Sequence, residues 1–364
     1  MPLTPADEYL THQTPYTFDT VATSDRNFYD RYFFNGYRRD GEIYFAAAMG
    51  VYPNLGVFDC AFSVVHNGRQ RFVRASRALG ADRMNTSAGA ISVDVIEPLK
   101  RIRVVVAPNE WGISADLVFE ARSLPMEEPH FLRRNGPMVA MDYTRMTQHG
   151  QWTGTLTVDG KSFEVQPSSW WGSRDHSWGI RNVGGRDPRG APPAAPPQFY
   201  WNWAPLNFDD RCTLFTTSEL PDGTRWHESG EILTPYPDAT ATHAAVSHEL
   251  KIEKGTRWIA DGSKIRLTPG VGDPFEVTFK PLYHFLMKGI GYGEPKWGHG
   301  MWVGPNEQDG GEYNLAAESP MANLHVQTVS QVTAGNRAGI GIFEIIVIGP
   351  YPRYGLNEMM DPAQ

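Results

Sequence analysis

Residues 168–181 read SSWWGSRDHSWGIR and lie near the middle of the 364-residue chain. The segment holds three tryptophans, two arginines, an adjacent acid and imidazole, and two glycines. Burying such side chains is costly unless every polar group finds a partner. A concentration of this kind favours the wall of a site, or a joint between domains, over an ordinary surface loop.

The sequence on both sides of this segment predicts an all-β fold. Apolar residues alternate with polar or small ones over 113–121, as in a half-exposed strand. Asp-Gly or Asn-Gly pairs at 40–41, 67–68 and 159–160 are typical of tight hairpin turns between strands. Strand-like runs recur at short spacing, and no long segment has a helical period, so the pattern indicates sandwiches or barrels.

The length of the chain exceeds what one hydrophobic core usually supports, so we expect two domains. The composition changes to Pro, Gly, Ala and Arg before residue 198, and a stretch of that kind forms neither a ladder nor a helix. The predicted organisation is an arm at 1–25, a first β domain at 26–185, a crossover at 186–197, a second β domain at 198–350 and a tail at 351–364.

Composition limits the partners and the compartment. The formal net charge of −8 argues against nucleic acid or an anionic membrane as the main partner. The two cysteines, Cys60 and Cys212, lie in apolar strand-like contexts and are expected to be buried free thiols. No run of 18 apolar residues occurs, and the N-terminus has no basic or apolar leader pattern. We therefore expect a cytoplasmic protein without a membrane span, and the oligomeric state stays open, with a homodimer as one option.

Asp175 and His176 are the first candidates for chemistry. Neighbouring residues on a strand point to opposite faces, so both would reach one cavity only if the backbone turned or bulged, which the flanking Gly172 and Gly179 would permit. A carboxyl in an aromatic wall has a raised pKa, as a general acid near neutral pH requires. The alternative is structural, with Asp175 paired to a flanking arginine.

The segment 289–302, GIGYGEPKWGHGMW, has a similar composition in the second half of the chain. His299 stands between two glycines and has the backbone freedom of a residue that approaches a ligand, although a solvent loop is the alternative. A phosphate-binding loop is excluded because the required strand–loop–helix context is missing. Metal-ligand spacing, Cys-x-x-Cys, Gly-x-Ser-x-Gly and a dinucleotide fingerprint are also absent, so an enzyme here would most simply perform acid–base chemistry without a cofactor.

Four segments together carry a resemblance to a known family: NFYDRYFF at 27–34, GVYPN at 50–54, RDHSWG at 174–179 and WGHG at 297–300. In order and type, they resemble the AttH-like/carotenoid 1,2-hydratase superfamily, in particular its branch in actinobacteria and sphingomonads. The resemblance implies two tandem lipocalin-like antiparallel β-barrels packed together, with few short helices and a ligand site near their junction. It also implies cofactor-free hydration or cyclisation of hydrophobic, often isoprenoid or polyketide, substrates by a buried acid in aromatic walls.

Two functions follow as hypotheses. The first is a hydratase/lyase, isomerase or cyclase acting on a terpenoid-, steroid- or aromatic-like substrate, with Asp175, His176 and His299 as catalytic residues. Its substrate-binding residues would be Trp171, Arg174, Trp178, Tyr200, Trp201, Tyr292 and Trp297. The second is a lipocalin-like carrier of an apolar small molecule without turnover. Asp175 and His299 on one cavity would favour the enzyme, whereas an Asp175 salt bridge outside any cavity would favour the carrier.

Overall fold

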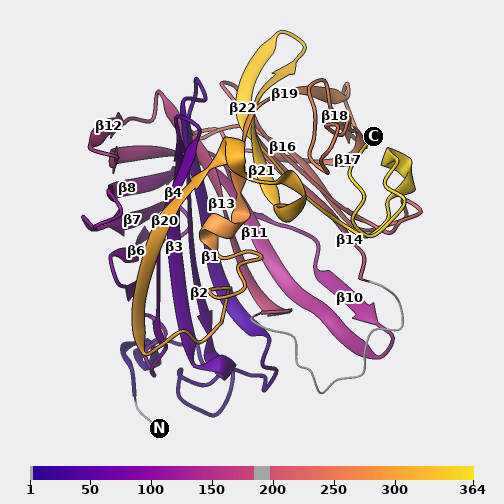
Figure 1. Cartoon of the computed structure of the whole chain (residues 1–364). Coiled ribbons are helices and arrows are strands. Elements are labelled where there is room, and N and C mark those ends of the chain that lie inside the picture. The colour runs from indigo at the N-terminus through magenta and orange to yellow at the C-terminus, as the bar shows by residue number, and fades with distance from the viewer. Residues whose placement is uncertain (1–2, 184–196) are drawn as a thin grey trace.

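A computed structural model describes residues 3–183 and 197–364 and consists mainly of antiparallel strands (Figure 1). The expectation of an all-β fold with few short helices is confirmed. Helical segments within the described residues are 3-10 turns of three or four residues. They are η1 (Pro5–Glu8), η2 (Pro53–Leu55), η3 (Met287–Ile290), η4 (Leu315–Ala317), η5 (Pro320–Ala322) and η6 (Pro352–Tyr354). The expected crossover at 186–197 lies, except for its last residue, outside the described residues.

The first sheet has fourteen strands in the order β20-β4-β3-β2-β1-β13-β11-β8-β7-β6-β5, with β9, β10 and β12 also paired to β11. It curls into a nearly closed barrel, whose two ends approach where the Ala90 N–H donates to Gln308 Oε1 at 2.6 Å. Its strands are β1 (Phe28–Arg38), β2 (Ile43–Tyr52), β3 (Val57–His66), β4 (Arg69–Ala78), β5 (Ser87–Ala88), β6 (Ile91–Glu97), β7 (Arg101–Val106), β8 (Ile113–Ala121), β9 (Met126–Glu127), β10 (Phe131–Asn135), β11 (Met138–Val158), β12 (Lys161–Val165), β13 (Trp170–Arg181) and β20 (Asn306–Asn314).

The second sheet closes on itself as an eight-stranded barrel. Its strands are β14 (Phe199–Phe208), β15 (Cys212–Glu219), β16 (Arg225–Leu233), β17 (Ala241–Glu249), β18 (Lys264–Pro269), β19 (Phe275–Leu286), β21 (Val326–Ala334) and β22 (Arg337–Ile348). Strand β20 comes from the same half of the chain but pairs with β4 of the first sheet, and in Figure 1 it lies as an orange ribbon among the purple strands.

The predicted hairpin turns form as the turn chemistry requires. Asn67-Gly68 joins β3 to β4 and Asp159-Gly160 joins β11 to β12, and all four residues have positive φ between 52° and 74°. These angles match the two-residue turns that follow strand twist. Strand β11 continues unbroken from Met138 to Val158 through Gly150. A Cβ there would lie 2.1 Å from the ring of Phe119, so this glycine serves close packing and not a turn.

The two barrels meet in a shared apolar core to which strands of both contribute. Phe33 and Tyr37 of β1 pack there with Trp203 of β14 and Ile342 of β22. The rings of Phe33 and Trp203 lie 6.0 Å apart, edge to face. Both cysteines are buried and free, which confirms the expectation. In the part of the chain that the structure describes, no helix has the length and apolarity that a membrane span requires.

Strand β13, which contains most of the segment quoted at the outset, lies between β1 and β11. Its pairing with β1 runs without a bulge, with Asp175 opposite Phe33 and Ser177 opposite Arg31. Regular pairing fixes the two-residue alternation of the side chains, so one face of β13 points toward the second barrel and the other into the first.

Candidate functional site

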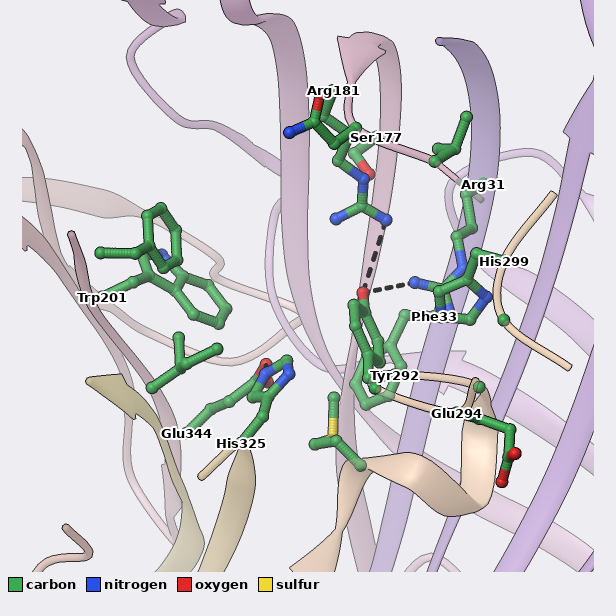
Figure 2. Close-up of a pocket in the computed structure, with 18 of the residues that line it drawn as sticks. Arg31, Phe33, Ser177, Arg181, Trp201, Tyr292, Glu294, His299, His325 and Glu344 are labelled. Carbon is green, nitrogen blue, oxygen red and sulfur yellow. Dashed lines mark hydrogen bonds and ion pairs between the residues drawn. The ribbon is translucent and has the colours of Figure 1, made fainter. Parts of the chain in front are cut away.

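A cavity of about 560 Å³ lies where the two barrels meet. Strands β1, β11 and β13 form one side of it, and β14, β22 and the segment 287–301 form the other. Its volume falls within the range of roughly 300–1,000 Å³ that is usual for small-molecule sites. Figure 2 shows side chains from both barrels directed toward one space. The cavity lies near the junction, where the resemblance implies a ligand site; that it binds a ligand stays a prediction.

Strand β13 divides its side chains between two environments. Asp175, Ser177 and Arg181 line the cavity. His176 lies on the opposite face, where its Nε2 is 2.6 Å from Asp30 Oδ1. Neither Gly172 nor Gly179 interrupts the ladder, so strand alternation places Asp175 and His176 on opposite faces. The two side chains therefore do not reach one cavity, in contrast to the prediction.

Asp175 is a half-buried carboxyl without a local partner. Within residues 3–183 and 197–364 it has neither a hydrogen bond nor an ion pair. Burial raises its pKa to about 6, and the charge of Glu344 acts in the same direction, while Arg145, Arg31 and Arg181 act against the rise. A carboxyl with this pKa keeps a reactive proton fraction near neutral pH, as a general acid requires.

Tyr292 stands at the centre of the cavity and contacts residues from both sides (Figure 2). Its hydroxyl oxygen accepts a hydrogen bond from Arg31 Nη1 and a longer one, 3.4 Å, from Arg181 Nη2. Its ring lies edge-on to those of His299 and His325, at 4.5 and 4.7 Å between centroids. Because both lone pairs of the hydroxyl oxygen have a donor, its own O–H is left to donate into the cavity.

His299 lines the same cavity as Asp175, as the enzyme hypothesis requires. Burial lowers its pKa to about 4, and the nearby charge of Arg31 adds to the effect, so the imidazole is neutral at pH 7. Its Nδ1 is 3.8 Å from Asp59 Oδ1, and Gly300 N donates to Asp59 Oδ2 at 2.7 Å. Asp59 therefore holds both the ring and the loop that carries it.

A second acid–imidazole pair on the cavity wall was not predicted. His325 Nε2 lies 2.5 Å from Glu344 Oε1, and Gln327 donates to the other carboxylate oxygen at 2.5 Å. Glu344 is the one acid in the apolar run GIGIFEIIVIG at 339–349. An acid in a strand that is otherwise suited to burial is a signal that could have identified it.

Arg145 forms the floor of the cavity with a buried partner behind it. Its guanidinium donates to both oxygens of Glu128, at 2.8 and 2.6 Å, and Thr147 donates to the same carboxylate at 2.7 Å. Burial opposes ionisation of Glu128, but the charge of Arg145 and the proximity of His227, whose Nε2 is 3.7 Å from Glu128 Oε2, outweigh it and lower the pKa of Glu128 to about 2. Both oxygens of the Glu128 carboxylate therefore accept hydrogen bonds.

Of the seven predicted substrate-binding residues, Trp201 and Tyr292 line the cavity. Three of the remaining ones, Trp171, Arg174 and Trp178, belong to β13. Trp171 lies between the guanidinium groups of Arg39 and Arg122, whose Cζ atoms are 3.8 and 4.1 Å from the centroid of its ring. Arg174 points into the first barrel and donates twice to Gln148.

Trp178 and the other two predicted binding residues are also placed away from the main cavity. Trp178 is 39% exposed on the face of β13 that also carries Arg174 and His176, with its ring 5.0 Å from that of His176. Tyr200 stacks on Tyr351 inside the second barrel, with 4.1 Å between the rings. Trp297 packs under Arg74 beside a much smaller cavity that adjoins His299. Strand alternation and the path of the 287–301 segment, which sequence spacing does not reveal, account for these positions.

Solved structures with the same fold have little sequence identity to this chain. A putative AttH from Nitrosomonas europaea is 14% identical, with a TM-score of 0.52 over 87% of this chain and 92% of that chain. CghA with Sch210972 is 13% identical, with a TM-score of 0.50 over 88% and 89%. Kievitone hydratase from Nectria haematococca is 11% identical, with a TM-score of 0.44 over 87% and 88%. The similarity to the first two structures shows that this chain shares their fold.

No curated protein matches the sequence. A family model does match it, over residues 3–357, which is nearly the whole chain. The chain therefore belongs to the family of unknown function DUF8625.

Proposed function

We propose that this protein is an acid–base enzyme, a hydratase/lyase, isomerase or cyclase, that acts on a hydrophobic terpenoid-, steroid- or aromatic-like substrate in the interdomain cavity. The observation that carries the proposal is Asp175: an unpaired carboxyl, with its pKa raised to about 6, that faces the same cavity as His299. A carrier has no need of an acid in this state, because an unpaired carboxyl that is partly removed from water only weakens the fold.

In the proposed reaction, Asp175 donates its proton to a carbon of a substrate double bond. The O–H bond of the acid breaks, a C–H bond forms, and positive charge develops on the adjacent carbon. Aromatic faces stabilise such a cation, and Phe33 and Trp201 line the cavity near the acid. Loss of a proton from the cation gives isomerisation, attack by an internal double bond gives cyclisation, and attack by water gives hydration.

His325 is the proposed base for hydration. If its Nε2–H is donated to Glu344, its Nδ1 can accept the proton that water loses when the new C–O bond forms. The proton then returns to Asp175 through solvent, so that atoms and charge balance over one turnover. Neutral His299 would order the attacking water. The bound Sch210972 in the CghA structure is consistent with a compound held within this fold.

The test separates an enzyme from a carrier. Ligands that co-purify with the protein are identified by mass spectrometry and then incubated with fresh protein in heavy water. The proposal predicts a product that carries deuterium on carbon, with or without the mass of one added water. A ligand that binds tightly and returns chemically unchanged, without carbon-bound deuterium, would support a carrier and contradict the proposal.

A further inference from the structure

Arg31 makes fewer hydrogen bonds than the other buried arginines of the described chain. It is 3% exposed, its Nη1 donates to Tyr292, and its Nε and Nη2 have no partner. Each of the others uses at least two nitrogens in hydrogen bonds to protein groups. They are Arg74, Arg122, Arg145, Arg174 and Arg257.

Arg181 is the second guanidinium without an acidic partner on this wall. Its Nη2 donates to the Tyr292 hydroxyl at 3.4 Å, and its guanidinium carbon, Cζ, lies 4.5 Å from the ring centroid of Tyr29. Neither Arg31 nor Arg181 has a carboxylate within 4.0 Å among the described residues, whereas Arg145 on the same cavity has Glu128. Desolvating a charge without a counter-charge is costly, so a protein keeps such a pair where a ligand supplies the missing charge.

The three groups converge on one place. Arg31 and Arg181 both point at the hydroxyl of Tyr292, whose own O–H is left to donate (Figure 2). The free N–H groups of two guanidiniums, together with one phenol, match the lone pairs of an oxyanion. The groups around them do not supply that anion: Asp59 is engaged by Gly300, and Glu294 lies 3.5 Å from Arg74.

We infer that the substrate carries an acidic oxygen, either a carboxylate or an enolised β-dicarbonyl, and that Arg31, Arg181 and Tyr292 bind it. The inference deepens the proposed function and relies on it for the cavity in which the substrate lies. Arg31 stands opposite Ser177 in the ladder, two residues from Asp175, so the oxyanion site adjoins the proposed acid. The substrate is then an amphipathic acid with an apolar body, not a plain hydrocarbon.

This arrangement also couples binding to catalysis. The charges of Arg31 and Arg181 now act against the rise in the pKa of Asp175. An oxyanion that neutralises both of them removes this effect, and its own negative charge further favours the protonated carboxyl. Binding of the substrate therefore favours the protonated form of Asp175.

The test compares two ligands of the same shape. Isothermal calorimetry measures the affinity of the intact protein for naphthoate and for neutral naphthamide, and a phenyl-substituted cyclic β-diketone, which is an enolate at pH 7, forms a third arm. The wild-type protein should bind at least one anion about tenfold or more tightly than the amide, since a charge-assisted hydrogen bond contributes about 1.5–3 kcal/mol. The tighter of the two anions distinguishes a carboxylate from an enolate substrate.

Arg31→Met and Arg181→Met should each reduce this preference about tenfold and leave affinity for the amide within about twofold. Arg266→Met removes an equal charge from an exposed pair with Glu276 and should change neither affinity. Arg31→Met should also raise the melting temperature, since it deletes an unpaired buried charge, whereas Arg266→Met should not. Equal binding of anions and amide by the wild type, no binding of either anion, or a preference that survives both substitutions would overturn the inference. Because the readout is binding, it does not depend on whether Asp175 proves to be catalytic.

Discussion

His325 Nε2 lies 2.5 Å from Glu344 Oε1 on the wall of the cavity that Asp175 faces from the opposite barrel. An acid on one wall and an imidazole–carboxylate pair on the other are what the two proton transfers of a hydration require: one to carbon and one from water. Asp175 belongs to the first barrel and the His325–Glu344 pair to the second, so the proposed reaction depends on the junction between the barrels.

The His325–Glu344 pair should be needed for hydration. His325→Gln keeps the size of the side chain but removes the base, and we expect formation of the hydrated product to fall about a hundredfold or more. His243→Gln changes an exposed His–Glu pair on β17 and serves as the matched control, with no expected effect. The rate is measured by mass spectrometry of the product. If His325→Gln were as active as His243→Gln, the assigned base would be wrong.

Asp175 should make the folded protein less stable at high pH. Its pKa rises from 3.8 to about 6 on folding, so its contribution to stability is complete below pH 4 and is lost as the pH rises through 6. Asp175→Asn should therefore stabilise the protein by about 1–3 kcal/mol at pH 8 and have little effect near pH 4. Urea unfolding at both pH values measures the difference. A destabilised variant at pH 8 would point instead to the structural role that the sequence left open.

Binding of an anion should draw a proton onto Asp175. At pH 7 this carboxyl is mostly ionised, and neutralising Arg31 and Arg181 raises its pKa, so naphthoate binding should take up about half a proton or more. Calorimetry in buffers of different ionisation enthalpy measures the uptake. Naphthamide should cause none, and Asp175→Asn should abolish the uptake by naphthoate. Equal proton uptake in that variant would assign it to another group.

The buried pair between Arg145 and Glu128 should stabilise the floor of the cavity. Glu128→Ala leaves the guanidinium buried without its partner, and we expect a loss of about 3–5 kcal/mol of unfolding free energy. Glu127→Ala alters the exposed last residue of the short strand β9, the neighbour of Glu128, and should cost less than about 1 kcal/mol. Urea denaturation compares the two. Similar losses would show that the pair adds little to the fold.

Local chemistry made most of the fold predictable. Turns at Asn67-Gly68 and Asp159-Gly160 depend on residues that accept positive φ, and strand alternation reads directly from the sequence. Strand β20 was missed because its sequence, NEQDGGEYN, is polar and glycine-rich, and only its distant partner β4 makes it a strand. Pairing between segments so far apart leaves no local pattern.

Only part of the candidate site was predictable from the sequence. Asp175 and His299 were identified by composition, and they line one cavity, but His176 was assigned to it despite the alternation that places it on the other face. Arg31 was overlooked within an aromatic strand, and Glu344 within an apolar one. Whether such a charge has a partner is a property of the tertiary structure, and sequence spacing cannot show it.

The central claim is that Asp175 delivers a proton to carbon. The most direct measurement is the rate at which deuterium from heavy water enters a carbon of the co-purifying ligand, compared between Asp175→Asn and Asp142→Asn. Asp142 forms an exposed pair with His130 on β11 and serves as the control for the same chemical change. We predict that Asp175→Asn slows incorporation by about a hundredfold or more, while Asp142→Asn matches the wild type. Wild-type incorporation by folded Asp175→Asn protein would contradict the account.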